Sequence, residues 1–348
     1  MEVVHMSFIS YLINGISLGS VYALIALGYT MVYGIAKMLN FAHGDVIMVG
    51  AFITYTMCST MGLSPVIGVL AAVIACTLLG MAIEKVAYKP LRKASSPLAV
   101  LITAIGVSYL LQNLATYITG GLPQMYPSLP GLSSQITIAG TSTKMVTVIT
   151  PFLVVALVVV LTQLINHTKI GMAMRAVAKD FETSQLMGIK INRVISTTFI
   201  IGSALAALGS ILYFTNYPYI TPTAGAMPGL KAFVAAVFGG IGSIPGAVIG
   251  AFLIGICENI IKALPFEGAT TFVDAFTFAL LIIVLVFVFL TGSAVAAAKI
   301  NAKIRDIDVS FRYSDAQSEG NAQLRLSGRS GQTGSTSVEV YLSLIHIS

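Results

Sequence analysis

The stretch that decides the fold is residues 146–193, in which the apolar run VTVITPFLVVALVVVLTQLIN (146–166) passes directly into the polar run HTKIGMAMRAVAKDFETSQLMGIKINR (167–193). A second apolar run, 195–216, follows at once. Each apolar run has about the 20 residues that an α-helix needs to span a bilayer. Charge is kept out of hydrocarbon, so the polar run, called the island below, must lie outside the membrane.

The composition of the whole chain agrees with a membrane protein. Hydrophobic residues make up 56% of the 348 residues, charged residues make up 9%, and the mean hydropathy is +0.91. The apolar runs are long and do not alternate with polar residues, which favours helices over the strands of a membrane barrel. We therefore predict an all-α, polytopic membrane protein with about eight to nine transmembrane helices and with broken or re-entrant segments.

Apolar runs long enough to span a bilayer recur along the chain, and a shorter one stands among them. The long runs fall near 8–36, 43–62, 64–84, 97–119, 146–166, 195–216, 244–262 and 271–291. The short run, 229–241, would rise only about 20 Å as a helix. We expect it to cross as half of a broken helix with protein around its ends, which places the basic stretch 299–305 on the same side as the island.

Basic residues set the expected orientation. The connector 85–93 and the island are both rich in lysine and arginine, and positively charged loops stay in the cytoplasm. The loop 120–145 holds a single basic residue, Lys144, and should lie outside. The net charge of +6 therefore reports orientation rather than a nucleic-acid surface.

The chain divides by composition into two parts. Residues 1–298 form the predicted transmembrane domain, and residues 299–348 form a polar tail rich in Ser, Gly, Arg and Gln. Such a stretch has little apolar surface to bury. We expect the tail to be disordered or not native to the protein, with a regulatory tail as the alternative.

Small residues recur at every fourth position in three of the expected helices. The columns are Gly15, Gly19 and Ala23; Gly202, Ala206 and Ser210; and Gly246 and Gly250. Within a membrane such columns let helix backbones approach closely. We expect them to serve packing between helices of one chain rather than a dimer seam.

A polar run, Asn40-Phe41-Ala42-His43-Gly44-Asp45, interrupts the apolar sequence between the first two expected spans. One interpretation is a tight connector at the cytoplasmic surface, in which Asn40 or Asp45 caps the next helix. The other is an unwound stretch that lines a path through the membrane. The sequence does not choose between them. His43 has no second ligand one helical turn away, so it predicts no metal site.

A glycine-rich run, Gly239-Gly240-Ile241-Gly242-Ser243-Ile244-Pro245-Gly246, follows Lys231. It lacks the Gly-Lys-Ser/Thr ending of a phosphate-binding loop and lies among apolar helices, so we interpret it as a hinge or a turn between half-helices. Glu258 and Asn259 lie late in a later span. We expect them to be solvated at a helix end, with a role in a path through the membrane as the alternative.

No residue pattern indicates catalysis. None of the four histidines is spaced with a nucleophile and a carboxylate in a way that would indicate a catalytic triad. The chain also has no nucleotide-binding motif. We therefore predict a protein that is not an enzyme, with no catalytic residues, no metal ligands and no cofactor of its own. If it moves a solute uphill, another protein must supply the energy.

Several stretches form a recognisable set when taken together. Near the N-terminus they are Asn14-Gly15-Ile16-Ser17-Leu18-Gly19-Ser20-Val21-Tyr22-Ala23-Leu24, Ala26-Leu27-Gly28-Tyr29-Thr30 and the run Asn40–Asp45. Further along they are Arg175-Ala176-Val177-Ala178-Lys179-Asp180, Met187-Gly188-Ile189 with Arg193-Val194, and Lys231-Ala232-Phe233 with the glycine-rich run. This set resembles the branched-chain amino acid ABC transporter permeases over about residues 8–291, and it is specific only in combination.

The resemblance implies a multi-pass subunit of a bacterial inner-membrane importer for leucine, isoleucine or valine. Its partners would be a second related permease, two cytoplasmic ATPases that bind the ATP, a periplasmic or extracellular amino-acid-binding protein, and membrane lipid. No nucleic acid and no cofactor in this subunit are implied.

By the same analogy, the island belongs to a coupling segment, 167–195, that docks on an ATPase. Met174, Val177 and Phe181 share one helical face at i, i+3 and i+7, as in a short interfacial helix, and a solvated loop against lipid headgroups is the alternative. The coupling candidates are Arg175, Lys179, Asp180, Glu182, Gly188 and Arg193. The candidates for the translocation pathway or its gating are Asn40, His43, Asp45, Lys231, Gly240, Gly242 and Pro245.

Two other functions stay open. A secondary transporter or channel would need no ATPase, but it would normally show a membrane-embedded carboxylate pair or an inverted repeat, and neither is evident in the sequence. The other function is that of a same-family permease that carries urea or short amides. It stays open because the substrate specificity of such importers rests mostly with the binding protein. The chain departs from the family beyond Lys299 and at Leu290-Thr291-Gly292, where the family tends to have a proline before Thr-Gly.

Overall fold

The structure is a computed structural model, and it describes residues 2–92, 97–138, 141–264, 271–279, 282–283, 286, 307–312 and 323–328. The chain separates into two compact units, Met1–Leu281 and Ile282–Ser348. In the second unit, β5 (Ile307–Arg312) pairs antiparallel with β6 (Gln323–Gly328). The predicted boundary near residue 299 lies outside the described residues, so the division there and the nature of the tail stay predictions.

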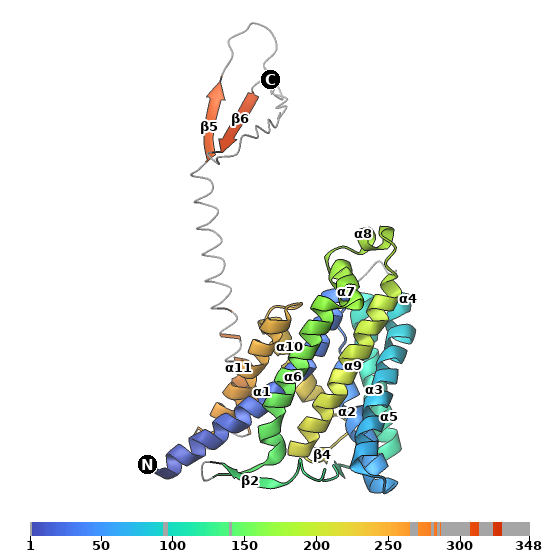
Figure 1. The fold of residues 1–348 in the computed structure, drawn as a ribbon, viewed down its shortest axis with the longest axis vertical. Coiled ribbons are helices and arrows are strands. Elements are labelled where there is room, and N and C mark those ends of the chain that lie inside the picture. The colour runs from blue at the N-terminus through green and yellow to red at the C-terminus, as the bar shows by residue number, and fades with distance from the viewer. Residues whose placement is uncertain are drawn as a thin grey trace, which may run out of the picture. The chain divides into compact units, whose positions relative to one another are not determined.

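The first unit is built almost entirely of helices (Figure 1). In the described part of the chain, six helices are long and apolar enough to cross a membrane. They are α1 (Glu2–Ala36), α3 (Pro65–Ile83) with its extensions η2 (Glu84–Tyr88) and α4 (Lys89–Leu91), α5 (Pro97–Thr119), α6 (Met145–His167), α9 (Ile191–Asn216) and α11 (Ile244–Lys262). The predicted all-α membrane fold is confirmed.

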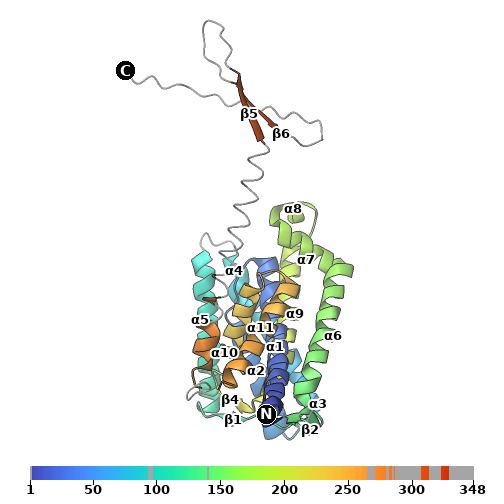
Figure 2. The ribbon, with the colours of Figure 1, turned by 90° about the vertical axis from the view of Figure 1, so that its left-hand side faces the viewer.

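The two ends of the bundle differ in structure, as Figures 1 and 2 show. One end, called the island end, carries α4 and the island helices α7 (Lys169–Lys179) and α8 (Phe181–Leu186). The opposite end, called the strand end, carries the short pairs β1 (Gln124–Met125) with β4 (Tyr219–Ile220) and β2 (Gln135–Ile138) with β3 (Thr141–Lys144). The described parts of the connector (85–92) and the island thus share an end, opposite the described parts of the loop (120–138 and 141–145), as their charges predict.

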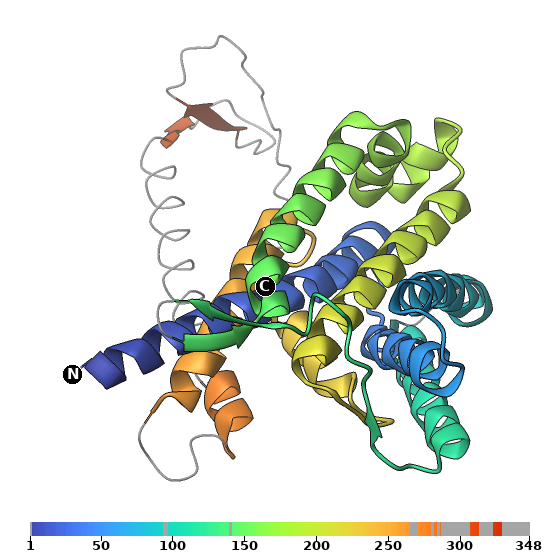
Figure 3. The ribbon, with the colours of Figure 1, turned by 60° about the horizontal axis from the view of Figure 1, so that its bottom comes forward.

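Helix α1 forms the centre of the first unit because it is apolar on all sides and buries nearly all of its residues from Gly15 to Ala36. It packs against α11 and α9 (Figure 3). A Cβ atom added at Gly19 would lie 2.8 Å from the Cα of Phe252, and one added at Gly15 would lie 3.0 Å from the Cα of Ile256. These glycines therefore let the backbones of α1 and α11 meet within one chain, as expected.

Two helices begin in the interior rather than at an end. Helix α2 (His43–Tyr55), continued by η1 (Thr56–Thr60), starts after a non-helical segment that leads in from the end of α1. Helix α10 (Ala226–Phe238) starts after a segment that leads in from β4 at the strand end. A Cβ atom at Gly44 would lie 2.7 Å from the carbonyl oxygen of Gly225, and one at Gly229 would lie 2.7 Å from the Cα of Gly44. The N-termini of two half-helices therefore meet inside the bundle.

The short predicted run 229–241 accordingly forms most of a half-helix. The chain passes from β4 at the strand end through α10 to a turn at 239–243, which lies beside Gly34, near the end of α1. This path fits the predicted crossing by a broken helix. The last predicted span, 271–291, is described only in part, with residues 273–279 helical, and the stretch 299–305 lies outside the described residues.

Candidate functional site

The island folds as two short helices that meet at a sharp corner. Helix α7 is capped by Thr168, whose hydroxyl accepts a hydrogen bond from the Gly171 amide at 3.0 Å. Met174 and Val177 are buried against the bundle, which agrees with the predicted apolar face. Phe181 is only half-buried and belongs to α8, not to α7, because Asp180 ends one helix and caps the next. Its predicted place on the face of a single helix is therefore wrong.

Asp180 holds the corner between the two helices. Its Oδ1 accepts hydrogen bonds from the backbone amides of Glu182 at 2.9 Å and Thr183 at 3.2 Å, and the Thr183 hydroxyl donates to Oδ2. Hydrogen bonds from Thr183 and Glu182 favour the charged carboxylate and lower the pKa of Asp180 below its ordinary value. Gly188 then ends the hairpin with φ +83°, a left-handed conformation that suits glycine.

The predicted coupling residues all lie on the exposed side of the island. Arg175, Lys179, Asp180, Glu182, Gly188 and Arg193 are exposed. The Arg175 guanidinium donates to Oδ1 of Asn166 at 3.0 Å. The most exposed apolar pair in this region is Leu186 and Met187, with exposed fractions of 87% and 79%, and neither was among the predicted coupling residues. An apolar Leu-Met pair directly before Gly188 was the available signal.

A buried ionic cluster joins the connector 85–93 to the start of α9. The Glu84 carboxylate is fully buried, contacts the Arg92 guanidinium, and accepts a hydrogen bond from the Ser196 hydroxyl at 2.7 Å. Arg92 also donates to Oδ1 of Asn192 at 2.6 Å. Glu84 was not among the predicted site residues, because it stands in the sequence as one acid at the end of an apolar run. This cluster links the region directly after the island to the membrane helices.

The polar run Asn40–Asp45 lies in the interior. Asn40, His43 and Asp45 are buried, and Oδ1 of Asn40 accepts a hydrogen bond from the hydroxyl of Tyr88 at 3.0 Å. Ala42 occupies the N-cap position of α2 and makes no side-chain capping bond. The interpretation as a surface connector capped by Asn40 or Asp45 is therefore wrong, and the unwound interior stretch is the geometry observed.

His43 fills a space that Gly28 leaves open. A Cβ atom at Gly28 would lie 2.5 Å from Cε1 of His43, and the imidazole packs edge-on against Tyr29 with ring centroids 4.7 Å apart. Neither ring nitrogen makes a hydrogen bond of ordinary geometry to a described residue, although the carbonyl of Ile25 faces the ring. Among the described residues, no cluster of three or more His, Cys, Asp or Glu side chains is arranged to hold a metal.

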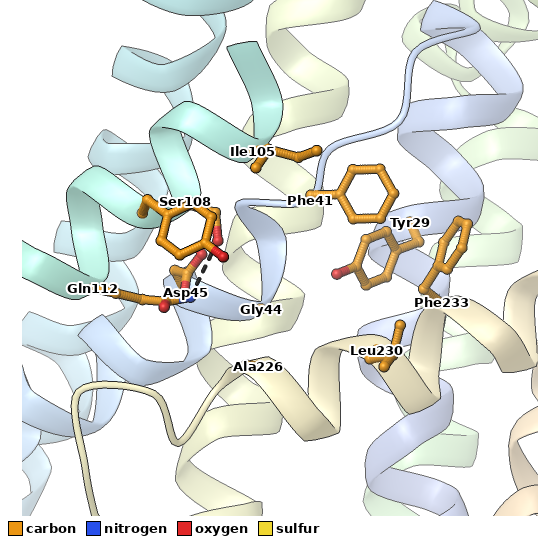
Figure 4. A pocket seen from close by; sticks show the side chains of 11 residues that line it. Tyr29, Phe41, Gly44, Asp45, Ile105, Ser108, Gln112, Ala226, Leu230 and Phe233 are labelled. Atoms are coloured by element: carbon orange, nitrogen blue, oxygen red, sulfur yellow. Dashed lines mark hydrogen bonds between the residues drawn. The ribbon is translucent and has the colours of Figure 1, made fainter. Parts of the chain in front are cut away.

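A cavity of about 310 Å³ lies between α1, α2, α5 and α10 (Figure 4). Aromatic rings form one wall. On the other side, Oδ1 of Asp45 accepts a hydrogen bond from Nε2 of Gln112 at 2.9 Å, and the same nitrogen lies 3.2 Å from Oγ of Ser108. Ser108 and Gln112 were missed because α5 reads in sequence as an ordinary apolar span. Of the predicted pathway residues, Asp45 lines this cavity and Asn40 and His43 do not.

Lys231 faces away from that cavity, into an ionic cluster of its own. Its Nζ lies 2.9 Å from Oε2 of Glu258 and 2.6 Å from Oδ1 of Asp274, while Lys262 holds the other oxygen of Glu258 at 2.9 Å. Tyr22 donates a hydrogen bond to Glu258 at 2.9 Å.

Glu258 and Asn259 are therefore buried, each with 4% exposure, and the expected solvation at a helix end is wrong. A carboxylate pair that the sequence did not reveal is present, formed by Glu258 and Asp274. Two lysines, Lys231 and Lys262, balance its charge.

The glycine-rich run forms the turn that joins α10 to α11. Gly240 and Gly242 adopt φ +88° and +97°, which favour glycine, and Ser243 caps α11 by accepting a hydrogen bond from the Gly246 amide at 3.3 Å. Gly239 and Gly246 stand so close that a Cβ on either would overlap the backbone of the other. Pro245 lies in the first turn of α11. The turn lies beside Gly34, near the end of α1, and none of its residues lines the cavity that holds Asp45.

Comparison with known proteins decides the family. The chain matches the family described as branched-chain amino acid transport system / permease component over residues 11–285. It is 41% identical over 290 residues to the high-affinity branched-chain amino acid transport system permease protein LivH of Salmonella typhimurium, which covers 79% of this chain and 92% of that protein. The chain belongs to the branched-chain amino acid permease family.

Further relatives of the permease agree. BraD of Pseudomonas aeruginosa, also described as a high-affinity branched-chain amino acid transport system permease protein, is 41% identical over 298 residues, 81% of this chain and 94% of its own. A probable branched-chain amino acid transport permease protein of Methanocaldococcus jannaschii is 28% identical over 242 residues, 68% of this chain and 76% of its own. No solved structure matches the chain.

The resemblance inferred from the motifs is thus confirmed, and the permease is a multi-pass membrane protein. The structure divides its candidate residues among four places. Asp45 lines the cavity; Asn40 and His43 lie in the adjoining interior; Lys231 lies in the Glu258 cluster; and Gly240, Gly242 and Pro245 lie in the turn that joins α10 to α11. Their roles in coupling and in the pathway stay predictions.

Proposed function

We propose that the permease is the membrane-spanning subunit of an ATP-driven importer for branched-chain amino acids in a bacterial inner membrane. The observation that carries this proposal is the 41% identity to LivH across 92% of that protein's length. The chain itself has no nucleotide-binding motif. Two cytoplasmic ATPases would supply the energy, a second related permease would complete the membrane part, and a binding protein would deliver the solute.

The shape of the island supports its role as the coupling segment. Two capped helices present Leu186 and Met187 at the tip of a polar surface, and an exposed apolar pair of this kind is typical of a contact with another protein. Arg175, Lys179 and Glu182 are exposed on the same two helices, as charges that a partner surface would meet. We infer that an ATPase binds this tip.

The Glu84 cluster supports a route from the island into the membrane. Movement of the island would pull on the start of α9, where Asn192 and Ser196 hold Arg92 and Glu84. These bonds connect α9 to the end of α3, so both helices would move with the island. Closure of the ATPases would then alternate the access of the central path, with the half-helices α2 and α10 as its most adaptable part.

Uptake by the reconstituted complex tests the proposal. The permease, its second permease, both ATPases and the binding protein are placed in proteoliposomes, and uptake of labelled leucine is followed with and without ATP. We expect leucine uptake to depend on ATP. Isoleucine and valine should compete with leucine for uptake, and urea should not. Equal uptake with and without ATP would contradict an ATP-driven importer, and competition by urea alone would shift the substrate to the amide class.

A further inference from the structure

The cavity between α1, α2, α5 and α10 has two unlike walls. The rings of Phe41 and Phe233 lie with centroids 5.6 Å apart, and Tyr29 lies 5.7 Å from Phe233, so the three rings form a continuous apolar surface. Figure 4 shows these rings on one side and the Asp45–Gln112 pair on the other. A volume of about 310 Å³ is enough for a small molecule.

Asp45 is a buried carboxylate that lacks a cation. Its residue exposure is 2%, and among the described residues none forms an ion pair with it. The basic residue on α10, Lys231, is already paired with Glu258 and Asp274. A buried charge is costly unless it is paired. Hydrogen bonds from Ser108 and Gln112 and the N-terminus of α2 compensate only part of that cost. The cavity therefore presents the group that an ammonium ion would satisfy.

The other walls suit the rest of an amino acid. Aromatic rings pack well against a branched aliphatic side chain, and their faces also attract cations. Gly44 and Ala226 line the cavity at the N-terminal ends of α2 and α10, where the helix dipoles favour a carboxylate. An anionic group, an apolar wall and two helix N-termini are thus arranged around one small space.

We propose that this cavity is a transit site for the imported amino acid within the permease. The site would hold the ammonium group at Asp45 and the aliphatic side chain against Phe41 and Phe233. The assignment rests on the proposed function for its ligand. Gln112 is a positioning residue, because it acts through its hydrogen bond to Asp45.

The mouth of the cavity opens between α5 and α10. Tyr109 and Leu230 line the cavity and are 62% and 42% exposed. A zwitterion does not approach through hydrocarbon, because its charges would lose their hydration. A transit site for an amino acid therefore requires that the mouth open onto the aqueous path that the second permease would enclose, and not onto lipid.

Ligand binding by the full complex without binding protein tests the chemistry of the site. Thermal unfolding is followed with leucine, with 3-methylbutylamine, which lacks the carboxylate, and with 4-methylpentanoate, which lacks the ammonium group. We expect stabilisation by leucine and by the amine, and none by the acid. Asp45→Asn should weaken the amine's apparent affinity by about tenfold to a hundredfold, as loss of a charge-assisted hydrogen bond would.

Matched variants separate binding from folding. Gln112→Ala should weaken binding and Asn113→Ala, its exposed neighbour on α5, should not. Phe233→Ala should weaken the binding of leucine and of the amine alike, because both carry the same aliphatic side chain, whereas Phe152→Ala, exposed on α6, should leave both unchanged. If wild-type complex imports leucine but Asp45→Asn and Phe233→Ala bind and transport it normally, the site is wrong and the function stands. If the wild-type complex imports no leucine, both the proposed function and the proposed site are wrong.

Cysteine labelling tests where the mouth opens. In a variant with Cys58, Cys76 and Cys257 replaced, Tyr109→Cys should react with a charged, membrane-impermeant maleimide in the full complex, and leucine should slow the reaction. Val160→Cys, equally exposed at 62% but within the apolar span α6 and outside the cavity, is the control and is expected not to react. An unreactive Tyr109→Cys, or a rate that leucine leaves unchanged, would overturn the assignment of the mouth.

Discussion

The amino group of Lys231 lies 2.9 Å from the carboxylate of Glu258, and both side chains are only 6% exposed. The pair joins α10 to α11, and Asp274 and Lys262 extend it to a cluster of two acids and two bases. Because the cluster balances its own charge, it suits a structural role within the bundle better than the carrying of an ion. It fixes one side of the half-helix whose other side lines the cavity.

Removing one member of this cluster should destabilise the protein. Glu258→Gln leaves Lys262 unpaired and Lys231 with one partner, and breaking a buried pair costs about 3–5 kcal/mol. Lys262→Gln removes a more exposed charge, with side-chain exposure of 25%, and should cost less than about 1 kcal/mol. Thermal unfolding of the purified complex measures both. Equal midpoints for the two variants would contradict a structural role for the Lys231–Glu258 pair.

The contact between Gly28 and His43 predicts a second, local effect. Gly28→Ala places a methyl group against a buried imidazole, and overpacking of this kind costs about 1–3 kcal/mol. Gly106→Ala, a helical glycine on α5 with open space around its Cβ position, is the matched control and should be neutral or slightly stabilising.

A double variant distinguishes a steric cause from a general loss of helix packing. Gly28→Ala combined with His43→Ala should recover part of the stability lost by Gly28→Ala, because the smaller side chain makes room for the methyl group. Strictly additive losses in thermal unfolding would show that His43 is not the group against which Gly28 is packed.

Local patterns in the sequence predicted the parts of the fold that depend on local physics. Apolar length predicted the spans, charge predicted which connectors share an end, and small residues predicted where α1 and α11 approach. Met174 and Val177 were predicted correctly because they lie within a single helix.

Features that depend on tertiary contacts were missed or misread. Glu258 resembles a solvated helix end until folding brings Lys231 and Asp274 against it. The partners of Asp45 lie on α5, whose polar residues do not stand out in an apolar span. Phe181 was misplaced because hydrophobic periodicity continues across the Asp180 cap, where the helix does not.

Gly188 gives a third prediction, one about backbone conformation alone. Its φ is +83° and nothing lies within 4 Å of a Cβ atom built there, so a substitution meets strain but no clash. Gly188→Ala should cost about 1–2 kcal/mol locally and lower ATP-coupled uptake, whereas Gly188→Asn, which tolerates the left-handed region better, should retain more uptake. Equal uptake by wild type and both variants would show that the end of α8 does not matter for coupling.

The exposed tip of the island gives the sharpest test of coupling. Leu186→Ser with Met187→Ser removes the apolar contact without touching the N-caps Thr168 and Asp180 or the buried face of α7. We expect the double variant to insert normally, to bind the ATPases at least tenfold more weakly, and to lose ATP-dependent leucine uptake. Arg175→Glu, which reverses an exposed charge on α7, should also reduce uptake. Met61→Ser, a 60% exposed methionine at the strand end, is the control and should leave uptake unchanged. Normal ATPase binding by the double variant would place the docking surface elsewhere and leave the island as a solvated connector.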